Sequence, residues 1–288
     1  MPASLSPLEI KTDISETLLI NNSILKMKKF IWILAAALPM VFTSCGDDND
    51  EMLTLDQTEM SVNYQGTAVK LKASEKNCTW TSENDFIAEV DGDGNVTPKH
   101  VGTTTIVATK DGNKATCKVT VNPTNTKFTN PVLTFGANVE AVKASVAAQK
   151  LNLNLNDEEE EKENGVNWTT LYYSTGMDMN YPWYAYIFEE NKLATSALTV
   201  GGEDDMIELD AFLQQYYDRY GETEDGYVYR NAATEAKATV WVEYELDVED
   251  DNATAYYTST SSTKGGDVFA SPAMKMAKKA VRKASARK

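Results

Sequence analysis

Cysteine and histidine are scarce in this chain of 288 residues. The three cysteines, Cys45, Cys78 and Cys117, are too few for a small fold held together by a framework of disulfides. The single histidine, His100, has no sequence context that supports a Ser-His-Asp or Cys-His catalytic pair, so we expect it to be a loop residue. A glycine-rich phosphate loop, a metal-ligand cluster and a nucleophile motif are also lacking. We therefore expect a protein that is not an enzyme and has no cofactor.

Basic residues are few relative to acidic ones. Without residues 1–44, the chain has 23 Lys and Arg against 40 Asp and Glu, a net charge of −17. A surface this acidic is repelled by the phosphates of nucleic acids and by anionic membranes. We expect no nucleic-acid partner for the body of the protein.

An apolar run of 13 residues, Phe30–Phe42, follows two lysines and ends shortly before Cys45. A helix that crosses about 30 Å of hydrocarbon needs roughly 20 residues, so this run is too short to span a membrane. A positive start, a short apolar region and small polar residues are the three parts of a signal peptide. We therefore interpret residues 27–44 as a signal peptide. Because Met27 begins a complete signal by itself, a mis-set start codon explains residues 1–26.

The end of this signal, Phe42-Thr43-Ser44-Cys45, resembles a bacterial lipobox. In that family the cysteine sulfur is acylated and the chain is cut before the cysteine. The resemblance implies that Cys45 is the lipidation site and that membrane lipid is a partner through its acyl chains. An ordinary signal peptide with an incidental cysteine is the alternative.

Acidic residues follow the cysteine directly. Gly46–Glu51 resembles the acidic export signal of Bacteroidetes-type surface lipoproteins. The resemblance implies that residues 45–52 direct the protein to the outer membrane, lipid-anchored and facing the cell exterior. A solvated acidic linker is the alternative. The residues of the implied signal are Asp47, Asp48, Asp50 and Glu51.

Residues 53–122 consist of short alternating segments separated by Gly and Asn/Asp turns, the pattern of an antiparallel sandwich. Trp80 is suited to filling the core of such a sandwich, and Gly94 permits a turn between the segments on either side. This region resembles the bacterial Ig-like domain of group 2, found in intimins, invasins and many surface proteins. The resemblance implies a spacer or an adhesion module. It rests on Trp80, Ser82, Asn84, Ile87, Ala88, Val90, Gly94, Val96, Gly102, Thr103, Ile106, Val119 and Val121.

Asp91–Asn95 in this domain matches the first half of a calcium-binding loop, with oxygen ligands at positions 1, 3 and 5. The twelfth position is Gly102, where such a loop requires a bidentate glutamate. We therefore predict a hairpin turn at this segment.

Cys78 and Cys117 are both expected to point into the core, on strands that flank a third strand. That arrangement places them roughly 9 to 10 Å apart, whereas a disulfide needs about 4.4 to 6.8 Å between Cα atoms. We expect two free thiols, although export favours pairing.

A polar linker, residues 123–131, precedes a second region, 132–258, and 13 of the 14 tyrosines lie beyond the linker. Helical spacing predicts helices in residues 135–149 and in Asp205–Tyr220, the second ending at Gly221 as a C-cap. Strands are predicted at residues 151–155, Trp168–Thr175, Trp183–Glu190, Leu193–Val200, Tyr227–Arg230, Thr239–Leu246 and Ala253–Thr258.

This order of helix, strands, helix, strands predicts an α+β domain with helices packed on an antiparallel sheet, and leaves room for two related halves. The order resembles the C-terminal regions of uncharacterised surface lipoproteins and beta-lactamase-inhibitor-type repeats. Neither resemblance carries a site over. The predicted fold class is thus an all-β Ig-like sandwich followed by an α+β domain.

The segment Trp183–Phe188 has apolar side chains on both faces of the predicted strand. If helices cover only one face, the other presents an aromatic platform of the kind that stacks on sugar rings. We take Tyr172, Tyr184 and Tyr186 as its candidate residues. The alternative is a central strand that is buried on both sides.

Two acidic runs, Asp157–Glu163 and Asp247–Asp251, hold carboxylates that could serve in acid/base chemistry. Catalysis needs two carboxylates in unlike environments, whereas runs in loops are solvated. We expect the first run to be an exposed loop, and a surface hydrolase is only the third-ranked function.

Residues 259–288 end in a basic stretch, Met274–Lys288, which has seven basic and no acidic residues. The stretch follows a Ser/Thr/Gly-rich segment and has few large apolar residues, so we predict a disordered linker and tail. Binding to lipid phosphates or polyanions, and folding back onto the acidic body, are the alternatives.

Together these features favour a cell-surface lipoprotein whose Ig-like domain presents a C-terminal domain that binds a glycan or a host-surface protein. The alternative is a structural or accessory lipoprotein of an envelope or nutrient-uptake assembly, with no ligand of its own.

Overall fold

The structure is a computed structural model that describes residues 52–176, 181–260 and 268–287. These residues form the two predicted domains, and each is described by itself. Among them, no helix is both long enough and apolar enough to cross a membrane.

The first domain is a sandwich of two sheets, as predicted. One sheet has the order β1-β7-β6-β3, with β1 parallel to β7, and the other has the order β2-β5-β4. Ile106, Val96 and Leu71 are buried between them. The strands are β1 (Glu59–Asn63), β2 (Val69–Lys70), β3 (Thr79–Ser82), β4 (Ala88–Val90), β5 (Asn95–Pro98), β6 (Gly102–Lys110) and β7 (Asn113–Asn122).

Gly94 has the role that the sequence predicts for it. Its φ of +82° lies in the left-handed region that favours glycine. A Cβ atom there would lie 2.8 Å from the carbonyl oxygen of Leu71 and 2.9 Å from the ring of Trp80. The turn can therefore be this tight, and Trp80 can pack against it, only because the side chain is absent.

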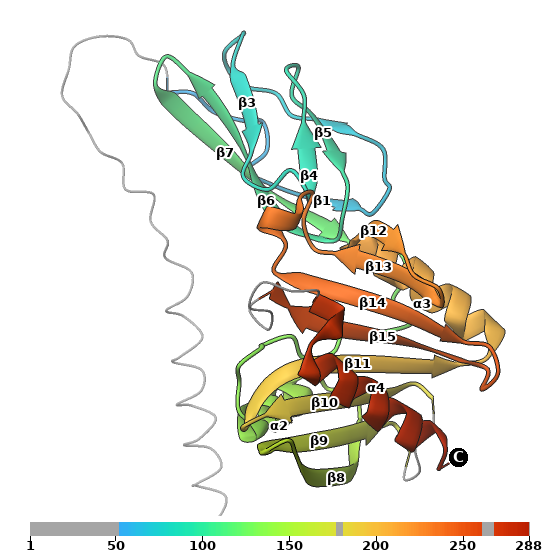
Figure 1. Ribbon diagram of the computed structural model, residues 1–288. Helices are drawn as coiled ribbons and strands as arrows, with labels where there is room; N and C mark the ends of the chain where they lie inside the picture. The colour runs from blue at the N-terminus through green and yellow to red at the C-terminus, as the bar shows by residue number, and fades with distance from the viewer. Residues whose placement is uncertain (1–51, 177–180, 261–267, 288) are drawn as a thin grey trace, which may run out of the picture. The chain divides into compact units, whose positions relative to one another are not determined.

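The second domain is built on an eight-stranded sheet in which every neighbouring pair is antiparallel, in the order β12-β13-β14-β15-β11-β10-β9-β8. Figure 1 shows this sheet together with its helices. The elements are α2 (Val139–Ala148), β8 (Asn154–Glu163), β9 (Val166–Ser174), β10 (Trp183–Glu189), β11 (Lys192–Gly201), α3 (Glu203–Tyr216), β12 (Asp218–Glu222), β13 (Gly226–Arg230), η1 (Glu235–Lys237), β14 (Val240–Asp247), β15 (Asn252–Ser259), η3 (Val268–Ala270) and α4 (Pro272–Ser285).

The sheet consists of two halves with the same order of elements. In each half, one helix is followed by four consecutive strands: α2 with β8 to β11, and α3 with β12 to β15. The last strands of the two halves, β11 and β15, pair with each other at the centre of the sheet. The repeated order inferred from the sequence is therefore a repeated arrangement of elements in the structure.

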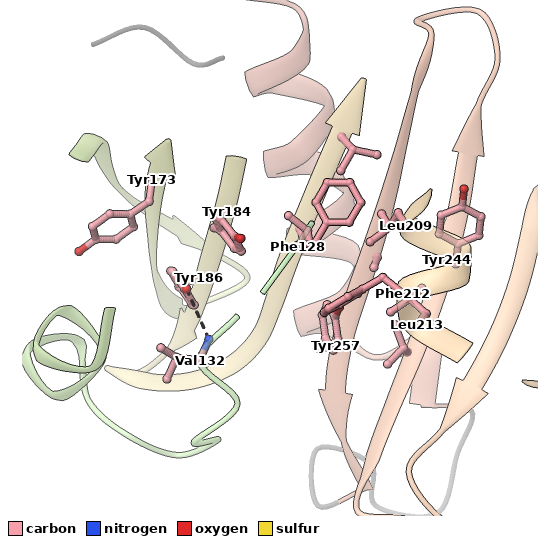
Figure 2. Packing of buried hydrophobic residues seen from close by; sticks show 14 of the residues in the cluster. Phe128, Val132, Tyr173, Tyr184, Tyr186, Leu209, Phe212, Leu213, Tyr244 and Tyr257 are labelled. Carbon is pink, nitrogen blue, oxygen red and sulfur yellow. Dashed lines mark hydrogen bonds between the residues drawn. The ribbon is translucent and has the colours of Figure 1, made fainter. Parts of the chain in front are cut away.

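One face of the sheet carries α2 and α3. Tyr184, Tyr186 and Phe188 of β10 point to this face and are buried with Val142 of α2 and Phe212 of α3. Figure 2 shows part of this cluster, with Tyr184 and Tyr186 on the side of Val132, and Leu209, Phe212 and Leu213 of α3 near Tyr257. Because side chains alternate along a strand, the remaining side chains of β10 point to the opposite face of the sheet.

The opposite face carries α4, which corrects the prediction of a disordered tail. Ala277 and Met274 of α4 pack on Trp183, Ala185 and Ile187 of β10. The helix begins at an effective N-cap, since the Ser271 hydroxyl accepts from the amide of Met274 at 3.2 Å and proline occupies the first turn. The stretch has too little apolar surface to fold in isolation. It forms a helix here because its apolar side chains are buried against the sheet.

Two other predictions of local structure are wrong. The acidic run at residues 157–163 is part of strand β8, not an exposed loop. Helix α3 ends at Tyr216, so that Gly221 lies in β12 and is not its C-cap. Residues 123–131 contain no helix or strand, and they pack against α3, since the amides of Thr124 and Asn125 donate to the buried Gln215 side chain at 2.7 and 2.9 Å.

Candidate functional site

The predicted aromatic platform is wrong. Tyr172, Tyr184 and Tyr186 have exposed fractions of 1, 4 and 0%. The Tyr184 hydroxyl donates to the carbonyl of Thr129 at 3.3 Å, and the Tyr186 oxygen accepts from the amide of Val132 at 3.4 Å (Figure 2). Burial raises the pKa of Tyr184 to about 12, although the hydrogen bond to Thr129 lowers it. The alternative, a central strand buried on both sides, is the correct one.

Tyr172 differs from the other two because it points to the α4 face. Its hydroxyl lies 3.4 Å from both a Glu159 carboxylate oxygen and the carbonyl of Ala280. The three tyrosines therefore do not share a surface, and they form parts of two separate cores.

Helix α4 lies in a trough with acidic rims. On one rim, β8 directs Asp157, Glu159, Glu161 and Glu163 to the α4 face, in register with Tyr172 and Trp168 of β9. On the other rim, β14 contributes Glu243 and Glu245. Basic residues of α4 reach both rims, so this surface belongs to the folding of the domain.

The ion pairs alternate along the helix. Lys279 contacts Glu161 at 3.0 Å and Glu163 at 2.8 Å, and Lys278 contacts Glu243 at 3.0 Å on the other side. Lys283 contacts Glu159 at 2.9 Å, and Arg287 pairs with Glu159 and Asp157. Of the alternatives for the basic stretch, folding back onto the acidic body is the one observed.

Glu159 receives the densest set of contacts on this rim. Burial raises its pKa, but hydrogen bonds from Lys283 and Arg287 outweigh burial and hold the pKa below its ordinary value. Glu159 is therefore kept ionised by the helix that it helps to hold.

A pocket of about 250 Å³ opens where the first turns of α4 meet the β8–β9 hairpin. We name it the α4 pocket. Val166, Trp168 and Met276 supply apolar surface, and Asn164, Glu189 and Lys275 supply polar groups. No pattern in the sequence indicates this site, because its walls come from segments about 100 residues apart, and one of these segments was expected to be disordered.

A second, wider pocket of about 340 Å³ lies beside the β10–β11 hairpin, lined by Phe135, Glu190 and Lys192. Glu190 is already engaged, since it accepts from the backbone amide of Asn167 at 2.9 Å. The polar groups of this second pocket are thus partly engaged in hydrogen bonds within the domain.

The Ig-like domain holds the other residues singled out by the sequence. Asp91 accepts from the amides of Asp93 and Asn95, both at 2.9 Å, which is the predicted hairpin turn. Hydrogen bonds from Asn95 lower the pKa of Asp91. No group of three potential metal ligands occurs among the residues that the structure describes.

His100 lies in a loop, as expected, and its ring stacks on Phe86 with centroids 3.9 Å apart. Burial lowers its pKa, against a raising contribution from a hydrogen bond to the Phe86 carbonyl. Cys117 is buried and Cys78 half-buried, and both are free thiols, as predicted. Their strands are separated by β6, the third strand that the sequence analysis placed between them.

The predicted lipidation site, Cys45, lies outside the described residues. The same is true of the predicted leader, the signal peptide and the acidic residues of the implied export signal, Asp47, Asp48, Asp50 and Glu51. These assignments stay predictions from the sequence.

Comparisons with known proteins bear on the first domain. No curated protein matches the chain. Among solved structures, domains 1–6 of the surface layer protein SbsC are similar at 17% identity and a TM-score of 0.21, over 48% of this chain and 25% of that one. The N-terminal eight Ig domains of Down Syndrome Cell Adhesion Molecule isoform 1.30.30 are similar at 11% identity and a TM-score of 0.21, over 68% of this chain and 26% of that one.

This chain thus spans about a quarter of the length of each of these structures, and at such TM-scores neither supports an argument about function. The family comparison is more specific. Residues 52–121, which form the sandwich described above, match the bacterial Ig-like domain (group 2) family.

Proposed function

We propose that this protein is a lipid-anchored protein of the bacterial cell surface. In this proposal Cys45 carries the acyl chains, the Ig-like domain separates the anchor from the α+β domain, and the α+β domain binds a glycan or a host-surface protein. The observation that carries the proposal is the order of parts along the chain. The family match begins at residue 52, directly after the acidic segment, and Leu53 is already a buried core residue.

This order supports a spacer role for the Ig-like domain. A folded domain that starts within a few residues of an acylated cysteine is the part of the chain next to the membrane. Two or more acyl chains on one cysteine supply the stable attachment that a single chain does not.

Metabolic labelling with a fatty acid tests the anchor. The unaltered chain should incorporate label and stay in the membrane fraction, whereas Cys45→Ser should do neither. Cys78→Ser is the matched control and should be labelled normally. Unchanged labelling of Cys45→Ser would refute the anchor.

Protease added to intact cells tests surface display. Changing Asp47, Asp48, Asp50 and Glu51 to Ala should preserve labelling but protect the protein from digestion. If both forms are digested equally, the acidic segment is only a linker.

A structural or accessory role is the second candidate, and one observation favours it. Helices cover both faces of the eight-stranded sheet, so the aromatic residues on which the ligand prediction rested belong to the core. Chemical cross-linking on intact cells separates the two roles. An accessory protein should be recovered with the same envelope proteins in every growth condition, without any dependence on added glycan.

A further inference from the structure

We propose that the α4 pocket is a binding site for a single pyranose ring of a glycan. The proposal rests on the proposed function only in assigning a glycan to the α+β domain. It follows from the chemistry of the pocket walls, which combine an apolar floor with unused polar groups at the rim.

The unused polar groups are Glu189 and Lys275. Glu163, which also lines the pocket, is paired with Lys279 at 2.8 Å. By contrast, the side chains of Glu189 and Lys275 are in no ion pair or hydrogen bond within the described part of the chain. One side of the rim therefore offers a carboxylate acceptor and the other an ammonium donor, both ready to bind a ligand.

The floor of the pocket is apolar. Val166 and Trp168 of β9 and Met276 of α4 form it, with Pro272 beside them. Trp168 and Met276 are only 3% and 4% exposed and close the bottom of the pocket, so the apolar surface that a ligand can reach is mainly that of the half-buried Val166 and the exposed Pro272. A pyranose has a face of C–H groups that packs on such a floor and an edge of hydroxyls that reaches the rim.

Charge distinguishes a sugar from an ion. A small anion would be attracted by Lys275 but would meet the carboxylates of Glu189 and Glu163, and a small cation would meet the ammonium. A hydroxyl both donates and accepts, so adjacent hydroxyls of one ring can satisfy Glu189 and Lys275 together. The volume of about 250 Å³ lies just below the usual range for drug-sized ligands, which fits one ring.

The pocket also depends on α4, because Pro272, Lys275 and Met276 are all in the first turns of that helix. The region predicted to be a disordered tail therefore supplies one wall of the site.

Saturation-transfer NMR on the purified full chain tests the proposal. The probes are the methyl pyranosides of glucose, galactose and mannose, and N-acetylglucosamine, with glycine as the competing zwitterion. We expect saturation of the ring C–H protons of at least one sugar, with a Kd on the order of 1 mM, the affinity typical of so few contacts.

Lys275→Met assigns the binding to this pocket, because Lys275 lines it and not the second pocket, whereas Glu189 lines both and Glu189→Gln tests the carboxylate. Glu189→Gln and Lys275→Met should each weaken binding about tenfold, the loss expected for one hydrogen bond to a charged group. Lys192→Met, in the neighbouring pocket, and Glu249→Gln, on an exposed turn, are the matched controls and should leave the Kd unchanged. Thermal melting of all four variants checks that they fold.

Three results would overturn the proposal: no saturation of any of the four sugars, equal binding by the pocket variants and the controls, or binding of glycine in place of sugar. The outcome is independent of the anchor. Sugar binding without fatty-acid labelling would refute the lipid anchor alone, and labelling without sugar binding would refute the pocket alone.

Discussion

The two faces of the eight-stranded sheet are covered by helices of different chemistry. On the face of α2 and α3, large side chains such as Tyr186, Phe188 and Phe212 fill the core. On the other face, α4 contributes small and flexible side chains, and four of its basic residues, together with Arg287 just after it, face six carboxylates on the rims. Helices α2 and α3 are held mainly by apolar burial, with single ion pairs such as Lys143–Glu158 and Arg219–Asp210, whereas α4 combines burial with a dense set of ion pairs. The two faces should therefore respond differently to substitution, salt and pH.

Removal of α4 should have the largest effect. Deleting residues 268–288 exposes the side of the sheet that holds Trp183 and Ile187, and removes the burial of Met274, Met276 and Val281. At roughly 1.5–3 kcal/mol for each of these three side chains, the loss is about 4.5–9 kcal/mol, which is comparable to the whole stability of a domain. Binding of a dye specific for exposed apolar surface should rise, and the α+β domain should melt at a much lower temperature. If the truncated chain melts like the full one, α4 is not part of the core.

On the first face, Tyr186→Ala should lower the free energy of unfolding by about 3–5 kcal/mol, the cost of removing a large buried ring. The same substitution would cost less than about 0.5 kcal/mol if Tyr186 were exposed. Ile207→Ala, at a site that is 63% exposed on α3, is the control and should change stability little. Denaturant unfolding of the unaltered chain and of the two variants measures these free energies of unfolding. A small loss for Tyr186→Ala would contradict the described core.

Reversing one charge should perturb only the α4 face. Lys279→Glu places a third carboxylate beside Glu161 and Glu163, and should cost about 1 kcal/mol because these groups are half exposed and screened. Salt should reduce the cost, and adding Glu161→Lys should restore part of the stability. Lys237→Glu, at a lysine with no ion pair among the described residues, is the control. Thermal melting at low and high salt distinguishes the variants, and an equal loss for both would rule out the acidic rim as the cause.

The smallest expected effect is on the pH dependence of stability. Because the folded-state pKa of Glu159 lies below its unfolded value of about 4.3, its ion pairs stabilise the fold above that pH and are lost as the pH falls through the lowered pKa. Stability should therefore fall from about pH 5 downward, and less steeply in Glu159→Gln. Glu160→Gln, on the same strand and in no ion pair of the described chain, should keep the original slope. Identical slopes for the two variants would remove Glu159 from this role.

The first domain could be predicted from its sequence almost completely. Its turns depend on local residues such as Gly94 and Asp91, whose hydrogen bonds and backbone angles involve near neighbours in the chain. Its alternating strands need only one another to form a core. The same holds for most strands of the second domain and for α2, whose N-cap, Asn138, accepts from the amide of Ala141.

The predictions failed where the partner is distant in sequence. The run of carboxylates at residues 157–163 is unfavourable as a strand by itself, because like charges on one face repel. It forms β8 by pairing with β9, and Lys279, Lys283 and Arg287, more than 110 residues later, lie against its carboxylates and offset their repulsion. The α4 pocket was missed for the same reason, since it does not exist until the helix and the hairpin come together.

The two-domain organisation, the Ig-like sandwich and the alternation of apolar side chains on β10 follow from local patterns in the sequence. Periodicity and turn residues act over a few positions, and these features depend on nothing farther away. Long-range packing sets which faces of the sheet are covered, because the apolar side chains of a strand are the same whether a helix or a ligand covers them. It placed Tyr186 in a core, turned a basic tail into a helix, and formed a pocket from Trp168, Glu189 and Lys275, three residues that no local pattern connects.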